Sequence, residues 1–384
     1  MADLDDVRRR LESLLGVPAT EGNLVQPLRN GMRIFPAMLE AITGAQESVD
    51  LLTYIYWTGR PAEAFADALA ERAQAGLRVR VLIDAVGGAR MDRALTTQMR
   101  DAGAHVEFFR PPWLRSPFVH NHRTHRKVLV VDGSVAFTGG VGIAEEWDGD
   151  ARDPSEWRDT QVRVDGPAVA GLQAAFVQNW AETTGHVDRT QTSYPPLHPA
   201  GRDVVHVVRG TATVGWDDMQ TAWYGLLTSA RERVTLQTAY FAPDRHFLTL
   251  LTDCAARGVQ VDLLLPGPHY DKTLSRLGSE RHYETLLDAG VRLWRYQPTM
   301  LHTKVLTVDD RIAMVGSSNY NRRSLDHDEE VAIIVYGGSV PTELRAHFFD
   351  DCDRAEPVSP QRWRRRSAVQ RAGETAAGAL RRYL

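Results

Sequence analysis

One short pattern of histidine, lysine and aspartate occurs twice in this chain of 384 residues. In each copy the lysine follows the histidine by two positions, and the aspartate follows the lysine by five. The two copies are His125, Lys127 and Asp132, and His302, Lys304 and Asp309. The chain has 45 Lys and Arg residues, but Lys272 is the only lysine outside the two copies. Arginine would serve equally well as a generic surface charge, so lysine at these two positions indicates a site that requires a compact ammonium group.

The paired histidines could transfer a group that contains phosphorus. One imidazole can attack the phosphorus and form a covalent phosphohistidine, while the other protonates the leaving oxygen and then deprotonates the incoming alcohol or water. The two lysines can neutralise the negative charge that grows on the phosphate. This chemistry requires the two copies to face one another across a pseudo-two-fold axis. Residue types alone do not say which histidine attacks.

Two carboxylates stand at matching places after the copies. Asp159 and Glu330 each precede a glycine by seven residues. We expect each to accept a hydrogen bond from the far nitrogen of a histidine, which fixes the tautomer and orients the ring. The plainer alternative is a carboxylate that caps a strand. Asp132 and Asp309 come at the ends of strands, so we expect them to hold turns and not to touch substrate.

Glycine-containing turns follow each copy and are further candidates. Gly139-Gly140 and Gly316-Ser317 begin fourteen residues after their histidines, and Asn319 lies just beyond the second pair. We expect Asn319, Ser317 and Gly140 to contact the substrate phosphate, although they could also simply close a turn.

The segments around the two copies are repeated as well, and they must position the chemistry. Continuous apolar runs rich in β-branched residues at 79–83 and 259–265 predict buried parallel strands, and helical stretches that end in glycine separate the expected strands. The expected strands are 49–56, 79–83, 106–109 and 128–131 in the first half, and 234–241, 259–265, 293–296 and 305–308 in the second. This order predicts an α/β protein of two pseudo-symmetric α/β/α sandwich domains with one active site at their interface.

We expect four parts along the chain. They are an N-terminal helix over 1–24, a first domain over 25–190, a second domain over 203–355 and a basic tail over 356–384. The junction is placed where Thr, Ser and Pro gather near 191–196. The tail could lie on anionic lipid or pack on the second domain as a solvated helix.

Composition narrows the possible environments and partners. A net charge of −4 argues against a broad nucleic-acid-binding surface, and Cys254 and Cys352 are too few for a disulfide framework or a cysteine metal cluster. His120 and His122 precede the first copy, but no carboxylate or cysteine stands at a useful spacing, so we expect no metal. The acidic first residues do not resemble a signal peptide, and no apolar run reaches the length of a membrane span. These features favour an intracellular protein, soluble or peripheral.

The duplicated pattern, followed by Gly-Gly or Gly-Ser, resembles the phospholipase D superfamily. The surrounding sequence is similar to bacterial cardiolipin synthases from about Gly22 to about Asp350, most specifically at 34–42, 137–140, 157–160, 240–244 and 319–324. The resemblance implies a metal-independent transfer of a phosphatidyl group from one phosphatidylglycerol to another, with no cofactor and with release of glycerol. It also favours His125 as the nucleophile. A cytoplasmic protein held peripherally at the inner face of the cell membrane is the expected setting.

Three positions depart from the pattern of that family. Gly142 and Thr124 stand where asparagine is common, and Asp328 replaces another frequent asparagine. The transmembrane helices that begin many cardiolipin synthases are absent, so the chain resembles the shorter kind. Three alternatives stay open: a phospholipase D that hydrolyses phospholipids to phosphatidic acid, a phosphodiesterase acting on nucleic acid, and a lipid-binding protein without activity.

Aromatic residues near the copies are candidates for lipid contact. Trp147 and Trp157 could form a wall for acyl chains, and Trp113 with Leu114 could form an exposed rim that contacts a membrane. Ordinary core packing is the alternative for each tryptophan. Lys272 could line the mouth of the site or be a solvated loop residue.

Overall fold

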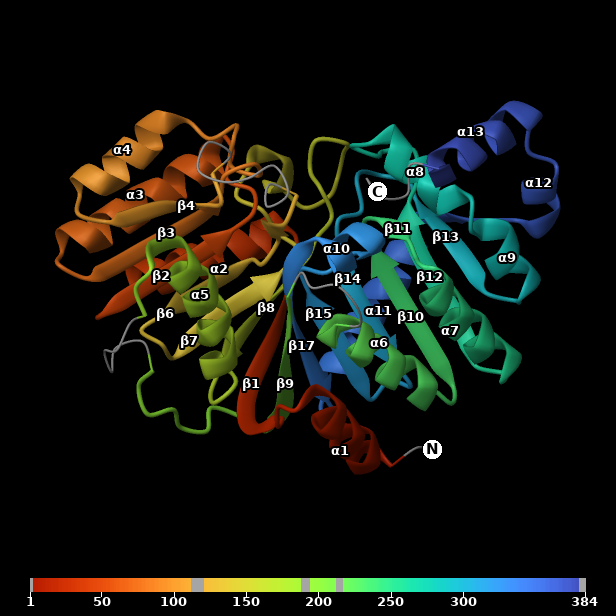
Figure 1. Ribbon diagram of the computed structural model, residues 1–384, viewed down its shortest axis with the longest axis horizontal. Helices are drawn as coiled ribbons and strands as arrows, with labels where there is room; N and C mark the ends of the chain where they lie inside the picture. Colours follow the sequence, from red (N-terminus) through yellow and green to blue (C-terminus); the bar gives the residue numbers. More distant parts are fainter. Residues whose placement is uncertain (1–2, 112–120, 188–193, 212–216, 380–384) are drawn as a thin grey trace.

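The chain forms one mixed β-sheet that runs through the whole molecule, with helices packed against it (Figure 1). This is seen in a computed structural model that describes residues 3–111, 121–187, 194–211 and 217–379. The first half of the chain lies on the left of Figure 1 and the second half on the right, and β1 and β9 meet between them. The α/β class expected from the sequence is confirmed.

The two halves contribute their strands in the same spatial order. From its outer edge inward, the first half supplies β4 (His105–Phe109), β3 (Arg78–Asp84), β2 (Ser48–Thr53), β6 (Val128–Val131), β7 (Val135–Gly139), β8 (Thr160–Asp165) and β1 (Thr20–Arg29). The second half supplies β13 (Arg292–Tyr296), β12 (Gln260–Pro266), β10 (Arg233–Thr238), β14 (Lys304–Val308), β15 (Ile312–Gly316), β17 (Asp328–Tyr336) and β9 (Asp203–Gly210). The duplicated order of strands along the chain, which the sequence predicted, is therefore confirmed, and the structure adds that the order within the sheet is duplicated too. The strands expected over 49–56 and 234–241 end earlier, at Thr53 and Thr238.

The halves share a single sheet, which the sequence did not predict. Strand β1 pairs with β9 through Thr20 opposite Val205 and Asn23 opposite Asp203. The short strand β5 (Arg123–Thr124) also crosses between the halves, because it pairs in parallel with the start of β17. The remaining short strands are β11 (Phe241–Ala242), β16 (Tyr320–Asn321) and β18 (Ala355–Pro357).

Helices cover the sheet and enclose three main cores. The first half supplies α2 (Gly31–Thr43), α3 (Arg60–Gln74), α4 (Arg93–Asp101) and α5 (Val169–Thr184). The second half supplies α6 (Asp218–Ser229), α7 (Arg245–Ala256), α8 (Thr273–Glu280), α9 (Tyr283–Asp288), α10 (Arg322–Asp326) and α11 (Val340–Cys352). One core packs α2 and α3 on the first half, and another packs α6 and α7 on the second. The third takes apolar residues from both halves under α5 and α11, so burial of this shared core holds the two copies in one arrangement.

The N-terminal segment packs on the second half of the chain. Helix α1 (Leu4–Leu15) buries Val7 and Leu11 in the same core as α6, as expected for a docking helix. It ends at Gly16, which has a positive φ of 66°. Strand β1 then begins at Thr20, five residues before the domain boundary expected at 25.

The basic tail, as far as Ala379, is folded against the second half. It forms α12 (Pro360–Arg364) and α13 (Ala368–Ala379), and α13 lies along α8. The Trp363 ring packs 4.8 Å from the ring of Tyr283, and Arg366 pairs with Glu284 at 2.9 Å. Of the two alternatives for the tail, packing on the second half is therefore observed. No helix in the described ranges is long and apolar enough to cross a membrane.

Candidate active site

The two histidines lie at the junction of the halves, each just before a central strand. His302 precedes β14 by two residues, and His125 lies between β5 and β6. Both side chains are buried. The backbone N–H of His125 donates to the Glu329 carbonyl at 2.8 Å, and that of His302 donates to the Arg158 carbonyl at 2.7 Å. Each histidine is thus fixed to the residue that precedes the carboxylate of the other half.

The carboxylates bind the histidines crosswise. Nδ1 of His125 lies 3.0 and 3.1 Å from the two carboxylate oxygens of Glu330, and Nδ1 of His302 lies 2.7 Å from Oδ2 of Asp159. Each pair therefore joins residues from opposite halves. A carboxylate on Nδ1 places the proton there and leaves Nε2 with a free lone pair. Asp159 and Glu330 each bind a histidine ring nitrogen, as expected from the sequence. The sequence did not predict that each carboxylate binds the histidine of the other half.

A further donor holds each carboxylate. The indole Nε1–H of Trp147 donates to Asp159 Oδ2 at 2.9 Å, and the hydroxyl of Ser317 donates to Glu330. A Cβ on Gly140 would lie 2.3 Å from Asp159 Oδ1, so only glycine lets the carboxylate sit there. Ser317 thus supports Glu330, and Gly140 leaves the space that the Asp159 carboxylate occupies. Contact of either residue with a substrate phosphate stays a prediction.

The two lysines lie beside their own histidines, as the spacing predicts. Nζ of Lys127 donates to the backbone carbonyl of His125 at 2.8 Å. Nζ of Lys304 lies 3.0 and 3.2 Å from the two ring nitrogens of His302. Both ammonium groups are buried. Two histidines, two lysines and two carboxylates thus form one buried polar centre.

Burial sets the protonation of this centre. It lowers the pKa of His125 to about 4 and that of His302 to about 3, so both imidazoles are neutral near pH 7. Burial also lowers the pKa of Lys127 to about 8 and that of Lys304 to about 7. An anion that enters between the lysines would raise these values and restore their charge.

Burial alone would raise the pKa values of the two carboxyls, but the neighbouring imidazole and ammonium groups reverse this. The pKa of Asp159 is lowered by His302 and Lys304, and that of Glu330 by His125 and Lys127. Both carboxylates are therefore ionised and accept hydrogen bonds from the imidazoles.

Aromatic rings surround His302 more completely than His125. The rings of Trp147 and Trp157 lie 5.1 and 5.5 Å from the His302 ring, and Tyr240 lies 6.1 Å away. Trp147 is fully buried, so it packs in the core and does not line an acyl-chain wall. The aromatic contact on His125 is Tyr54, at 5.1 Å.

The aspartates of the two copies hold turns, as predicted. The Asp132 carboxylate accepts from the backbone N–H groups of residues 46, 47 and 48 at 2.8–2.9 Å. The Asp309 carboxylate accepts from those of residues 231, 232 and 233 in the same way. Each turn thus ties the strand that follows Lys127, or the strand that begins at Lys304, to the start of β2 or β10.

The sequence of this chain matches known proteins along nearly its whole length. The sequence matches the family described as cardiolipin synthase, PLD-like domain, over residues 38–146 and 224–352. It is 30% identical over 368 residues to the cardiolipin synthase of Geobacillus sp. (strain WCH70), which covers 94% of this chain and 73% of that protein. The major cardiolipin synthase of Bacillus subtilis (strain 168) is 30% identical over 340 residues, covering 86% and 69%. The chain belongs to this family. It is a phospholipase D-type phosphatidyltransferase of the cardiolipin synthase kind.

Solved structures share the fold at lower identity. Phosphatidylserine synthase from Haemophilus influenzae Rd KW20 superposes with a TM-score of 0.76 at 16% identity, covering 99% of this chain and 100% of that one. Polyphosphate kinase from Porphyromonas gingivalis superposes with a TM-score of 0.55 at 16% identity, covering 88% and 49%. These likenesses concern the arrangement of the two halves and not the substrate.

Packing explains one departure from the cardiolipin synthase pattern. A Cβ on Gly142 would lie 2.9 Å from Cβ of Ile55 and 3.1 Å from the Trp147 ring. An asparagine at this position would therefore collide with Ile55 and with Trp147, the residue that donates to Asp159. Its counterpart Asn319 in the second half is buried, and its Oδ1 has no hydrogen-bond partner within the described ranges. Asn319 stays a predicted phosphate contact.

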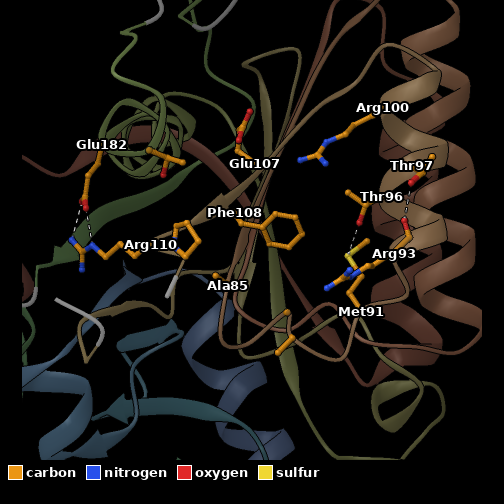
Figure 2. Close-up of a pocket in the computed structure, with 14 residues that line it drawn as sticks. Ala85, Met91, Arg93, Thr96, Thr97, Arg100, Glu107, Phe108, Arg110 and Glu182 are labelled. Carbon is orange, nitrogen blue, oxygen red and sulfur yellow. Dashed lines mark hydrogen bonds and ion pairs between the residues drawn. The ribbon is translucent and has the colours of Figure 1, made fainter. Parts of the chain in front are cut away.

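A hollow of about 750 Å³ opens in the first half, between α4 and the end of α5 (Figure 2). Arg100 points toward it from α4, Phe108 forms part of its wall, and the Arg110–Glu182 pair bounds the opposite side. No histidine or lysine of the two copies is among its described lining residues. Arg110 also pairs with Glu329 at 2.8 Å, so it connects the wall of this hollow to the strand that carries Glu330.

Other sequence candidates have varied outcomes. Lys272 is exposed and lies 5.6 Å from the ring of Tyr240, at the edge of the site on the His302 side. His122 lies against His327 with the rings 5.1 Å apart, as a rim residue. Trp113, Leu114 and His120 fall outside the described residues.

Proposed function

We propose that this enzyme makes cardiolipin by transferring a phosphatidyl group from one phosphatidylglycerol to another through a phosphohistidine. The observation that carries the proposal is the crosswise arrangement, in which two neutral imidazoles, each held at Nδ1 by a carboxylate of the other half, share one centre with two buried lysines. One neutral imidazole is the nucleophile that the first step needs, and the other is the proton carrier.

In the first step the donor phosphate lies between Lys127 and Lys304. Nε2 of His125, assigned as nucleophile by family resemblance, attacks the phosphorus and forms an N–P bond. The bound anion raises the pKa of His302, so its Nε2 takes up a proton from solvent before the reaction. The P–O bond to glycerol breaks as the leaving oxygen takes that proton from Nε2. Glu330 stabilises the positive charge that develops on His125.

In the second step a hydroxyl of another phosphatidylglycerol takes the place of the departed glycerol. Nε2 of His302 removes its proton, the oxygen attacks the phosphorus, and the N–P bond breaks. Cardiolipin leaves and both histidines return to their first state. If water entered instead, the same residues would produce phosphatidic acid, so the identity of the acceptor separates transferase from hydrolase.

Phosphatidylglycerol vesicles provide the test, with products followed by mass spectrometry. We expect cardiolipin and glycerol from the native chain, and no turnover from His125→Ala or His302→Ala. The exposed residue His105 offers a matched control, because His105→Ala should keep full activity. Phosphatidic acid without cardiolipin would instead establish a hydrolase, and cleavage of a nucleic acid without lipid turnover would refute both.

We also propose that the enzyme works as a peripheral protein on the anionic inner face of the cell membrane. Arg362 and Arg365 of the tail are exposed, although the tail itself is packed on the second half. Such arginines attract anionic lipid at a membrane surface. Replacing both by glutamate should reduce sedimentation with phosphatidylglycerol vesicles, while Arg152→Glu, on an exposed loop of the first half, should not. Equal sedimentation of all three proteins would contradict this role of the tail.

A further inference from the structure

Asp328 places a second buried carboxylate beside the pair formed by His125 and Glu330. Its side chain is 9% exposed, and its Oδ2 lies 3.3 Å from Nε of Arg323. Its Oδ1 is buried and has no hydrogen-bond partner in the part of the chain that the structure describes. An unsatisfied buried oxygen of this kind costs free energy, and a functional site is a common reason to keep one.

The strand geometry directs Asp328 toward the catalytic centre. Alternate side chains of a strand point to the same face, so Asp328 shares the face of Glu330 on β17. Glu329, between them, points the other way and binds Arg110 at 2.8 Å. Two residues along a strand span about 7 Å, so Asp328 lies roughly one small head group away from the carboxylate that holds His125.

The charges around Asp328 favour a neutral hydrogen-bond donor over a cation. Arg323 already supplies a positive charge on one side, and Lys127 contributes another from the catalytic centre. Burial, together with nearby Glu330 and Asp84, raises the pKa of Asp328 to about 8 although Arg323 opposes the shift. The group therefore carries little negative charge near pH 7, which gives an ammonium group little advantage over a hydroxyl.

We propose that Asp328 accepts hydrogen bonds from the free hydroxyls of the glycerol head group and so selects a polyol as the alcohol that enters or leaves. The lysines bind the phosphate, and Asp328 contacts the alcohol that is attached to it. This inference rests on the proposed phosphatidyl transfer. It adds a specificity residue that stays outside the bond-making steps.

A competition between acceptors tests the inference. The phosphatidyl-enzyme formed from phosphatidylglycerol is offered deuterated glycerol, 1-propanol and ethanolamine at equal concentrations, and the three lipid products are measured by mass spectrometry. Free glycerol is a competent acceptor because its capture is the reverse of the first step. The product ratio reports selection by a common intermediate, so it does not depend on how much total activity a variant keeps.

The native enzyme should favour glycerol over 1-propanol. Asp328→Ala should reduce that preference about tenfold, the usual scale for a lost hydrogen bond to a buried carboxyl. Asp328→Asn keeps an acceptor oxygen and should retain most of the preference. Asp326→Ala is the matched control, because Asp326 is an exposed neighbour that pairs with Arg322 at 2.6 Å, and it should leave the ratio unchanged.

Several results would overturn the inference. The inference is wrong if the native enzyme shows no preference for glycerol, or if it prefers ethanolamine; this result needs no variant. An unchanged ratio of glycerol to 1-propanol products in Asp328→Ala would also overturn the inference, but it would leave the transferase proposal intact. Absence of any turnover of phosphatidylglycerol by the native enzyme would overturn both.

Discussion

His302 takes its partner carboxylate from the opposite half of the chain, with Nδ1 lying 2.7 Å from Oδ2 of Asp159. His125 does the same with Glu330 at 3.0 Å. Neither half therefore contains a complete histidine–carboxylate pair. The continuous sheet and the shared core hold the two halves in the register that this exchange requires.

The crosswise pairing predicts which histidine responds to which carboxylate. Asp159→Asn should perturb the ring nitrogens of His302 and leave those of His125 near their native values, and Glu330→Gln should do the reverse. Nitrogen-15 NMR of labelled histidine measures this directly. Each variant should also lose activity on the order of 10²- to 10⁴-fold, because the amide no longer fixes the productive tautomer. A response of the histidine in the same half would contradict the pairing.

Trp147 is predicted to act through Asp159. Trp147→Phe keeps a large ring but removes the N–H that donates at 2.9 Å. We expect kcat to fall about tenfold with little change in KM, since a hydrogen bond to a charged group is lost without a change in the lipid-binding surface. Trp180→Phe, in the shared core away from the histidines, is the control and should keep its kcat. Equal losses in both variants would indicate a general packing effect instead.

The buried lysines predict that anion binding weakens as the pH rises. Phosphate binds the charged ammonium, and burial lowers the pKa of Lys304 to about 7 and that of Lys127 to about 8. Affinity should therefore be greatest below pH 7 and fall about tenfold per pH unit above pH 8 for one linked proton. Calorimetry with inorganic phosphate between pH 6 and 9 measures the slope.

Two controls accompany that measurement. Lys272→Ala removes an exposed lysine and should keep the native slope. Lys304→Ala should weaken phosphate binding at low pH. A native affinity that does not change between pH 6 and 9 would show that the lysines keep their charge despite burial.

Local patterns made most of this fold predictable, whereas contacts between distant segments did not. Apolar runs identified the strands now seen as β3, β12 and β14, because each is buried on both faces. The spacing of two residues between His125 and Lys127 predicted that the imidazole and the ammonium group lie on the same side of the chain. Spacing carries no information about which half supplies each carboxylate. The pairing of Asp159 and Glu330 with the histidine of the opposite half was therefore not predicted.

Two other features needed the packed structure. The role of Trp147 depends on its indole N–H meeting Asp159, and the sequence offered only an acyl wall or core packing. Gly142 departs from the asparagine that is common in the family, and Ile55 and Trp147 occupy the space that a side chain would need. Both features depend on contacts between segments that local sequence does not encode.

A buried ion pair across the two halves gives the last prediction. Nε of Arg158 lies 2.9 Å from Oδ2 of Asp351, and both side chains are fully buried. Arg29 and Gln237 also donate to the same carboxylate, at 2.6 and 3.1 Å. Asp351→Ala would leave buried guanidinium groups without their counter-charge, so the free energy of unfolding should fall by about 3–5 kcal/mol.

The neighbouring Asp350 makes a matched control for this variant. It also pairs with Arg29, at 2.9 Å, but its side chain is 60% exposed. Solvent screening limits such a pair, so Asp350→Ala should cost less than about 1 kcal/mol. Urea unfolding of both variants tests the contrast. Equal destabilisation would mean that Asp351 does not bind the two halves together, and the position of Asp159 beside Arg158 would then depend on the shared apolar core alone.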